Sequence, residues 1–235
     1  MRHFGIIGNP LEHSWSAQYF TEKFRKEGID ADYRLLPMAD IHGVEEVMDV
    51  LDGINVTLPY KQSIMAHLTD IDNTAQSIGA VNVVRGRKGY NTDWIGFVES
   101  LRPLLASSDR HALVLGTGGV SRAVQYGLRQ LGMDCLLVSR NPYGEAIAYG
   151  EIDANLLNTY TVVVNCTPLG MYPIVDACPN IPYDLLDERH LLFDCVYNPE
   201  HTLFLRRGQE QGTRTKNGLE MLHLQAEAAW KIWNE

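Results

Sequence analysis

The sequence predicts an α/β protein that contains a dinucleotide-binding domain. Three adjacent observations support this prediction: an apolar strand over residues 113–115, a glycine-rich turn over 116–119, and a helix whose apolar residues recur at helical spacing. A second apolar strand, residues 136–138, follows the helix and leads into Arg140. The order strand, glycine turn, helix, strand is that of the first βαβ unit of a dinucleotide-binding fold.

The glycine turn has the chemistry that a bound pyrophosphate requires. Gly116 permits the tight turn, and Gly118 lets the pyrophosphate approach the backbone, with Gly119 beside it. The helix that follows offers free backbone N–H groups and the positive end of its dipole. Ser121 replaces the third glycine of the usual pattern and is still small enough for close packing of the helix on the strand. The flanking strands and helix supply the context that a glycine turn alone lacks.

The end of the second strand indicates which dinucleotide is bound. Proteins that bind NAD usually place Asp or Glu there, to hold the ribose 2′-hydroxyl. This chain has Arg140 between Ser139 and Asn141, and a guanidinium with polar neighbours suits a 2′-phosphate. A solvated strand end is the alternative interpretation of Arg140. We predict NADP as the cofactor.

Length and charge limit the classes of function. The 235 residues suffice for one large domain or two small ones, and 45% hydrophobic and 21% charged residues are typical of globular proteins. With a formal net charge of −9, a broad surface for nucleic acid or for an anionic membrane is not expected. There is neither a signal pattern nor an apolar run near 18 residues, which predicts a cytoplasmic protein.

The first hundred residues predict a second α/β unit. Strands are expected over residues 4–8, 31–36, 54–57 and 80–84. Helices are expected over about 16–28 and 41–51, from Pro59 onward, and from Asp93 to Leu101, with a basic turn over 85–89. The alternation of strands and helices predicts a largely parallel sheet covered by helices.

After Arg140 the pattern departs from that of an ordinary doubly wound domain. Residues 141–144 have turn chemistry and residues 146–149 already resemble a strand, so the helix of this crossover is expected to be reduced to a loop. Two further strands are expected over 162–165 and 191–196, and two further helices over 202–211 and about 217–233.

Two ionisable residues are candidates for chemistry. Lys61 is expected in the first turn of the helix that begins at Pro59, where the helix dipole disfavours a cation by up to about 1 kcal/mol. A residue that opposes a local preference suggests a function, although a solvated surface lysine is the common alternative. Asp93 ends a polar Asn-Thr-Asp run before a helix, where its ordinary role would be that of an N-cap.

Polar residues near helix starts and faces are candidates for substrate binding. Ser14 and Ser16 look first like N-capping residues, but two hydroxyls beside a helix N-terminus could also bind a carboxylate. Gln225 lies at the rim of the apolar face of the last helix, with Met221 one turn before it, so both could line a cleft. The eight histidines form no pair with metal-ligand spacing, and no metal is predicted.

Several separated motifs together resemble the shikimate dehydrogenase family. They follow the family's order along nearly the whole chain: HSWS at 13–16, NVTLPYK at 55–61, GAVN at 79–82, NTDWIG at 91–96, GTGGVSRA at 116–123, NCTPLGM at 165–171, VYNP at 196–199, GLEML at 218–222 and QA at 225–226.

This resemblance implies an N-terminal α/β substrate domain, a Rossmann-type NADP domain, and a C-terminal helix that returns to the first domain. We expect the substrate domain over residues 1–101 and 218–235, and the NADP domain over 102–217. The implied activity is the reversible NADP-dependent reduction of 3-dehydroshikimate to shikimate, in the pathway to aromatic amino acids. The expected partner is this small molecule, with neither nucleic acid nor membrane, and the chain is expected as a monomer or homodimer.

The resemblance also assigns residues to roles. Lys61 and Asp93 match the catalytic pair of the family. Substrate contacts are implied for Ser14, Ser16, Thr57, Asn82, Tyr197 and Gln225. Cofactor contacts are implied for Gly116, Gly118, Gly119, Ser139, Arg140, Asn141, Asn165, Thr167 and Met221.

The chain departs from the family pattern around the expected 2′-phosphate site. Ser139 and Asn141 replace the family's Asn and Thr, and the basic residue usual a few positions later is absent, with Glu145 nearby. These changes concern the tightness of NADP binding more than the identity of the cofactor. Two alternatives stay open: a quinate/shikimate dehydrogenase that prefers NAD, and a non-catalytic regulator that responds to a dinucleotide. The intact Lys61 and Asp93 argue against the regulator.

Overall fold

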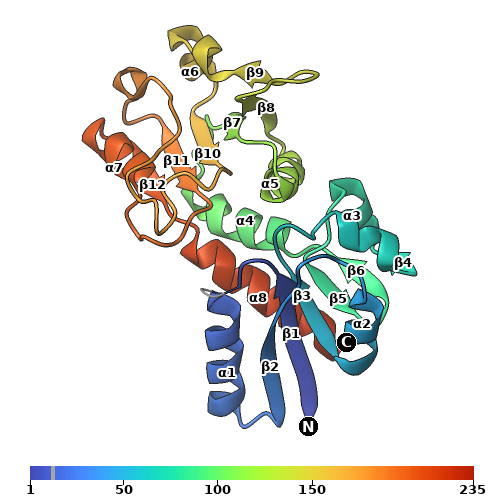
Figure 1. Ribbon diagram of the computed structural model, residues 1–235. Coiled ribbons are helices and arrows are strands. Elements are labelled where there is room, and N and C mark those ends of the chain that lie inside the picture. Colours follow the sequence, from blue (N-terminus) through green and yellow to red (C-terminus); the bar gives the residue numbers. More distant parts are fainter. Residues whose placement is uncertain (12–13) are drawn as a thin grey trace. The chain divides into compact units, whose positions relative to one another are not determined.

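The chain forms two compact units. The structure, a computed structural model, describes residues 1–11 and 14–235, so His13 of the first motif lies outside the described residues. One unit comprises Met1–Thr92 with Ala226–Glu235, and the other comprises Asp93–Gln225 (Figure 1). Helix α4 (Asp93–Leu101) therefore belongs to the second unit, as does the first part of helix α8 (Leu219–Asn234). The expected domain boundaries had assigned both segments to the substrate domain.

The first unit is built on a six-stranded sheet with the strand order β2-β1-β3-β5-β6-β4. Its strands are β1 (Arg2–Gly8), β2 (Ala31–Pro37), β3 (Gly53–Val56), β4 (Asp70–Ile71), β5 (Val83–Arg85) and β6 (Lys88–Tyr90). β1 pairs in parallel with β2 and β3, whereas β5 is antiparallel to β3 and β6. Since β4 also pairs in parallel with β6, the sheet is largely parallel with β5 as its antiparallel strand, and a β5–β6 hairpin occupies the expected basic turn.

Helices cover both faces of this sheet. Helix α1 (Trp15–Glu27) and the end of α8 pack on one face through Phe4, Phe20, Phe24 and Trp233. Helix α2 (Val44–Val50), the 3-10 helix η1 (Ser63–His67) and helix α3 (Asn73–Ile78) cover the other face. Trp233 fixes α8 to the sheet, because its Nε1 donates to the carbonyl of Val84 at 3.1 Å. The C-terminal helix thus returns to the first unit, as expected.

The segment after Pro59 differs from the expectation. The described residues 58–62 form turns rather than the start of an α-helix, and only the short 3-10 helix η1 follows. Lys61 therefore precedes the helical turn, so the prediction that it lies in the first turn of an α-helix is wrong. The apolar spacing of Ile64, Met65 and Leu68 misled the prediction, because one 3-10 turn can bury such a short set as well as an α-helix can.

The second unit is a parallel sheet with the strand order β12-β11-β10-β7-β8-β9, which is the order of a Rossmann domain. Its strands are β7 (His111–Leu115), β8 (Asp134–Ser139), β9 (Ile147–Ala148), β10 (Val162–Asn165), β11 (Leu191–Asp194) and β12 (Arg214–Lys216). The described residues 140–146 form a loop, and β9 pairs directly with β8. The shortened crossover is therefore confirmed.

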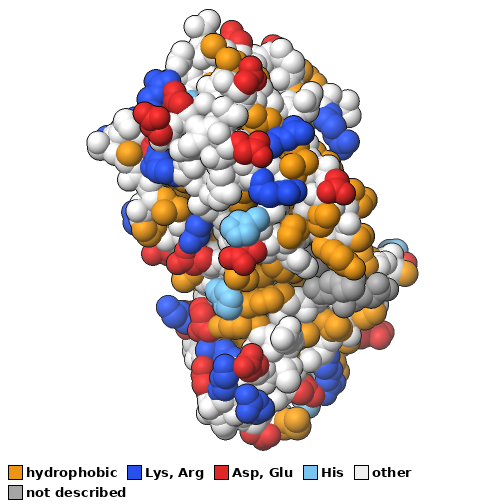
Figure 2. All heavy atoms as spheres, turned by 90° about the vertical axis from the view of Figure 1, so that its left-hand side faces the viewer, with side chains coloured by type: hydrophobic (Ala, Val, Ile, Leu, Met, Phe, Trp, Pro, Cys, Tyr) orange, Lys and Arg blue, Asp and Glu red, His pale blue; other side chains and the backbone are white. Residues whose placement is uncertain are grey.

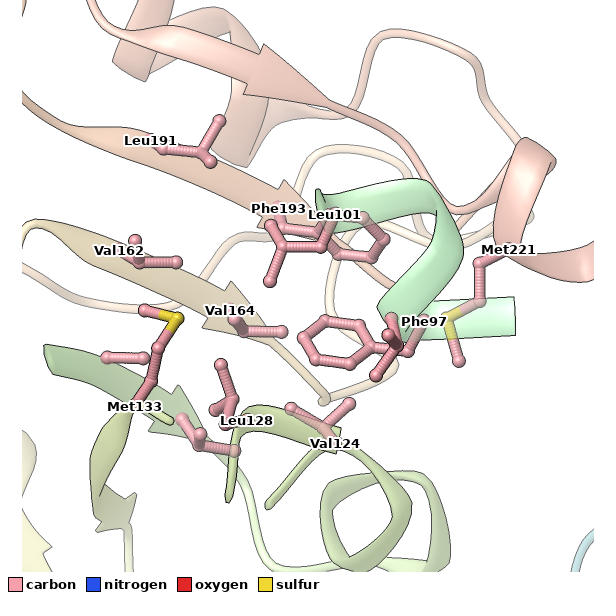
Figure 3. Packing of buried hydrophobic residues seen from close by; sticks show 13 residues of the cluster. Phe97, Leu101, Val124, Leu128, Met133, Val162, Val164, Leu191, Phe193 and Met221 are labelled. Atoms are coloured by element: carbon pink, nitrogen blue, oxygen red, sulfur yellow. The ribbon is translucent and has the colours of Figure 1, made fainter. Parts of the chain in front are cut away.

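Helices pack on both faces of the second sheet. Helices α4 and α5 (Gly119–Gln130) cover one face, where the rings of Phe97 and Phe193 meet edge to face with centroids 5.2 Å apart. Figure 3 shows Phe97 of α4 reaching among Phe193, Val164 and Val124. The other face carries α6 (Ala154–Thr159), the 3-10 helices η3 (Tyr149–Glu151) and η4 (Tyr183–Leu185), and α7 (Leu203–Glu210).

Charged side chains are mixed over the face that Figure 2 draws. Lysine and arginine lie interspersed with aspartate and glutamate, and the described residues on this face form no broad area of one sign. Among the described residues, no helix is long and apolar enough to span a membrane.

Helices α4 and α8 pack closely together at Gly96. A Cβ atom added to Gly96 would lie 2.3 Å from the carbonyl oxygen of Met221 and 3.0 Å from the backbone nitrogen of Gln225. Only glycine permits this approach, because any side chain would push the two backbones apart. The contact sets the position of Met221 and Gln225 against the helix that begins with Asp93.

The α4–α8 contact predicts a large cost for Gly96→Ala. We expect the free energy of unfolding to fall by about 1–3 kcal/mol or more, because the added methyl group meets backbone rather than a flexible side chain. Gly150→Ala is a suitable control, since a Cβ there meets nothing within 4 Å. Urea unfolding of both variants measures the difference, and a Gly96→Ala protein as stable as the control would refute the close contact.

Candidate active site

The turn between β7 and α5 fits a dinucleotide pyrophosphate. Gly116 has a φ of +102°, which side chains other than that of glycine rarely adopt. Gly118 is the N-cap residue of α5; it makes no side-chain cap, and the space where its Cβ would stand is open. The first N–H groups of an α-helix lack intrahelical partners, so the turn, with Gly119 opening α5, presents donors to an anion.

The loop after β10 lies against this glycine turn. A Cβ added to Gly116 would stand 2.9 Å from Cγ2 of Thr167. Asn165 ends β10 and fixes Thr167, because its Oδ1 accepts hydrogen bonds from the backbone nitrogen of Thr167 at 3.0 Å and from its Oγ1 at 2.7 Å. The structure therefore brings the predicted cofactor residues Gly116, Asn165 and Thr167 together.

The end of β8 presents Arg140 at the surface. Ser139 and Asn141 close a small turn around it, in which the Asn141 backbone nitrogen donates to Ser139 Oγ and Ser139 Oγ donates to the Asn141 carbonyl, both at 3.2 Å. Arg140 itself is exposed. A guanidinium at the carboxyl end of β8 stands where a Rossmann domain meets the adenosine ribose.

Tyr149 is a neighbour of Arg140 that the sequence pattern did not mark as a site residue. Ser139 pairs with Ala148 across β8 and β9, so Arg140 and Tyr149 are the next residues along the two strands. Burial raises the pKa of the Tyr149 hydroxyl, and the nearby Arg140 guanidinium opposes this shift. The neutral phenol can donate a hydrogen bond. The signal for Tyr149 is the shortened crossover, which brings the end of β9 directly beside the end of β8.

Asp93 and Gln225 belong to the same packed pair of helices. Asp93 is the first residue of α4 and is 6% exposed. Gln225 is 8% exposed, and its Nε2 donates to the Leu222 carbonyl at 2.9 Å. Gly96 lies one helical turn after Asp93 on α4 and contacts Gln225 on α8. The side chains of Asp93 and Gln225 are therefore both fixed by the α4–α8 contact. Met221 is buried in that contact.

The serines at the start of α1 differ in their surroundings. Ser14 is the N-cap residue by conformation, but among the described residues its side chain makes no capping hydrogen bond. Ser16 is buried and hydrogen-bonds the hydroxyl of Tyr33, which in turn donates to Oδ1 of Asn55 at 2.6 Å. Burial raises the pKa of Tyr33, and the bond from Ser16 opposes this shift. Neither serine serves its helix as a simple side-chain cap.

Lys61, Thr57 and Asn82 lie around the carboxyl ends of β1 and β3. Thr57 follows β3, and its backbone nitrogen donates to the carbonyl of Ile7 at 2.9 Å. The carbonyl of Lys61 accepts from the backbone nitrogen of Val81 at 2.7 Å. These backbone bonds hold Lys61 next to the segment that carries Asn82.

Asn82 is buried and fixes the residue before Asp93. Its Oδ1 accepts from the backbone nitrogen of Thr92 at 2.7 Å, and its Nδ2 donates to Oγ1 of Thr92 at 3.0 Å. Both the oxygen and the nitrogen of the Asn82 amide are thus hydrogen-bonded to Thr92. Asn82 therefore shapes the polypeptide at the point where it enters α4.

The predicted site residues fall into two groups. The first unit holds Ser14, Ser16, Thr57, Lys61 and Asn82. The second unit holds Asp93, Tyr197, Gln225 and every predicted cofactor residue. Tyr197 is half-buried in the loop after β11, and burial raises the pKa of its hydroxyl. Among the described residues, no three side chains of the metal-binding types gather in one place.

A Rossmann unit with a glycine turn and an arginine at the end of its second strand defines the class: a dinucleotide-dependent oxidoreductase with a second α/β unit. The family model of the shikimate dehydrogenase substrate binding domain matches residues 6–84. The shikimate dehydrogenase (NADP(+)) of Desulforamulus reducens is 34% identical over 257 residues, covering 97% of this chain and 88% of that protein.

Solved structures agree with the sequence relatives. Shikimate dehydrogenase from Aquifex aeolicus superposes with a TM-score of 0.89 at 33% identity, covering 100% of this chain and 92% of that one. The Thermus thermophilus enzyme, crystallised with NADP(H) and shikimate, gives a TM-score of 0.88 at 32% identity, with 99% and 93% covered. The chain belongs to the shikimate dehydrogenase family.

The position of Arg140 predicts its effect on cofactor binding. Arg140→Ala should weaken NADP binding ten-fold or more, about 1.4 kcal/mol, because a charged contact to the 2′-phosphate is lost. NAD binding should barely change. Arg129→Ala is a charge-matched control, since Arg129 lies in the last turn of α5, away from the glycine turn. Calorimetric titration with both dinucleotides measures the effect, and equal losses with both would show that Arg140 does not recognise the 2′-phosphate.

Proposed function

We propose that this chain catalyses the reversible, NADP-dependent reduction of 3-dehydroshikimate to shikimate. The observation that carries the proposal is the combination, in one chain of this family, of Arg140 at the end of β8 with the lysine and aspartate of the family's catalytic pair. The Thermus thermophilus relative, crystallised with NADP(H) and shikimate, supports it over nearly the full chain length. A steady-state assay of shikimate oxidation with NADP and with NAD tests the proposal, and no turnover with either would refute it.

The second unit provides the NADP site in this proposal. The glycine turn and the first N–H groups of α5 bind the pyrophosphate. Ser139, Arg140 and Asn141 at the end of β8 bind the 2′-phosphate. Asn165, Thr167 and Met221 border the nicotinamide half. When bound, NADPH supplies the hydride, so the protein must align the two reacting carbons and exclude water.

The first unit provides most of the substrate contacts. Ser14 and Ser16 bind the carboxylate of shikimate with their hydroxyls at the start of α1, where neither side chain is consumed as a helix cap. Thr57 and Asn82, together with Gln225 and Tyr197 from the second unit, contact the ring and its hydroxyls.

Lys61 and Asp93 carry out the proton transfer. As the ketone is reduced, negative charge develops on its oxygen, and Lys61 donates a proton to this oxygen or stabilises it. Asp93 orients a ring hydroxyl and acts with Lys61 as a unit. No step requires a metal ion.

A specific feature bears on the alternative of a quinate/shikimate dehydrogenase that prefers NAD. Glu145 is exposed in the loop after Arg140, near the place where the family pattern has a basic residue, and an acidic side chain close to a 2′-phosphate weakens its binding. Comparing both cofactors and both substrates, shikimate and quinate, separates the two enzymes. A cytoplasmic location and a monomeric or homodimeric state stay predictions.

The two serines should act in ground-state binding. Ser14→Ala and Ser16→Ala should raise the KM for shikimate more than they lower kcat, because the substrate carboxylate is bound equally in the ground and transition states. Steady-state kinetics with each variant checks this. A lowered kcat at unchanged KM would contradict the assignment.

Lys61→Ala should lower kcat by about two to four orders of magnitude, the usual range for a positioned acid or base. Asp93→Asn should also lower kcat, and the double variant should lose much less than the product of the two effects, since both act on one proton. NADP affinity should stay near that of the wild type.

Lys88→Ala is the matched control for Lys61, because Lys88 belongs to the same unit and pairs at 2.8 Å with Asp70 at the surface. It should leave kcat unchanged. Multiplicative losses in the double variant, or a nearly normal kcat in Lys61→Ala, would remove the pair from the mechanism.

A further inference from the structure

Asp194 is a buried carboxylate that no step above uses. It ends β11 and is 0% exposed. Its Oδ1 accepts hydrogen bonds from Asn165 Nδ2 at 2.9 Å and from the backbone nitrogen of Val196 at 3.0 Å. Its Oδ2 accepts from Thr202 Oγ1 at 2.6 Å. An ionised carboxylate only accepts hydrogen bonds, and here three donors converge on it.

Through Asn165 the network reaches the loop after β10. Asn165 donates to Asp194 with its amide nitrogen and accepts from Thr167 with its amide oxygen. Thr167 Oγ1 in turn accepts from the backbone nitrogen of Leu169 at 3.3 Å. The orientation of the Asn165 amide, and with it the loop beside the glycine turn, therefore depends on Asp194.

Through Val196 and Thr202 the network reaches the loop after β11. Val196 precedes Tyr197, and Thr202 is the N-cap residue of α7, where its Oγ1 also accepts from the backbone nitrogen of Leu205 at 3.4 Å. Both ends of the loop that carries Tyr197 are thus bonded to one carboxylate.

We infer that Asp194 is a positioning residue for the reaction, which holds the Asn165–Thr167 loop and the Tyr197 loop at a fixed spacing. The inference rests on the proposed function, because that function gives those loops their contacts with cofactor and substrate. Asp194 does not touch either ligand itself. It acts by accepting hydrogen bonds from both loops at once.

The network should depend on pH. Burial raises the pKa of Asp194 to about 6, although the bonds from Thr202, Val196 and Asn165 favour the ionised form. Below this pH the carboxyl group carries a proton, which removes its negative charge, weakens it as an acceptor for the three donors and adds a donor at one oxygen. Activity that depends on the two loops should therefore fall as the pH falls through about 6.

Two weakly acidic side chains interact electrostatically with Asp194, and both are neutral near pH 6. From η4 comes Tyr183, whose pKa burial raises. The neighbouring Cys195 thiol has a raised pKa, because of its contact with Cys166 from the end of β10 and because of burial. On α7, the guanidinium carbon of Arg207 lies 5.3 Å from the centre of the Tyr183 ring.

The opposite end of the same sheet offers a matched control. Asp109 is also buried, and it accepts from Thr161 Oγ1 at 2.8 Å, from the backbone nitrogen of Ala106 at 2.8 Å and from Arg214 at 3.1 Å. These contacts lie before β7 and β10, at the amino ends of the strands. Asp109→Asn therefore reports the general cost of disturbing a buried carboxylate network without affecting the two loops.

The experiment compares Asp194→Asn with Asp109→Asn in the full chain. We expect Asp194→Asn to lower kcat about 10- to 100-fold, the scale of a small misplacement of reacting groups. It should also weaken NADP binding measured by direct titration and remove the decline of kcat/KM below about pH 6. Asp109→Asn should keep all three properties, whatever its effect on thermal unfolding.

Thr202→Val provides a second variant that keeps the carboxylate. Since it removes one bond to the ionised form, the acid limb of kcat/KM should move to higher pH. Unchanged kcat, NADP affinity and pH profile in Asp194→Asn would overturn the inference, as would equal losses in Asp109→Asn. If the wild type turns over neither cofactor, the proposed function fails, and the NADP titration of the two variants still decides whether Asp194 positions the loops.

Discussion

The contact between α4 and α8 at Gly96 is the constraint on which the relative positions of Asp93, Met221 and Gln225 depend. The chain passes from one compact unit to the other at Thr92–Asp93 and again at Gln225–Ala226. Both points lie within about one helical turn of this contact, because Asp93 precedes Gly96 by three residues and Gln225 lies against it. One glycine thus fixes the side chains that begin and end the second unit.

The buried carboxylate of Asp194 illustrates how stability and function can oppose each other. The pKa of Asp194 is raised from 3.8 to about 6, which at about 1.4 kcal/mol per unit makes its ionised form cost the folded state roughly 3 kcal/mol at neutral pH. Since the folded pKa exceeds the unfolded one, this cost fades as the pH falls from about 6 to about 4. A polypeptide selected for stability alone would place a neutral group there; fixed loop geometry explains why a charge is present.

Local pattern predicted the start of the Rossmann half well, because β7, α5 and β8 are regular elements separated by a clear glycine turn. The glycine turn at Gly116 and the direct passage from β8 to β9 were both evident from residue types. Lys61 was misplaced because a turn and a 3-10 helix bury the same few apolar residues as an α-helix. Asp194 and Tyr149 could not be found, since their importance comes from neighbours that only strand pairing and the loops' return bring close.

The shortened crossover also determines the outer edge of the Rossmann sheet. The edge strand β9 has two residues, Ile147 and Ala148, both paired with β8. A long, flat edge strand is a template on which another chain can add a strand, whereas a two-residue edge presents too few backbone groups to hold one. Replacing a helix with a short loop and a minimal strand therefore leaves this side of the sheet poorly suited to aggregation through strand addition.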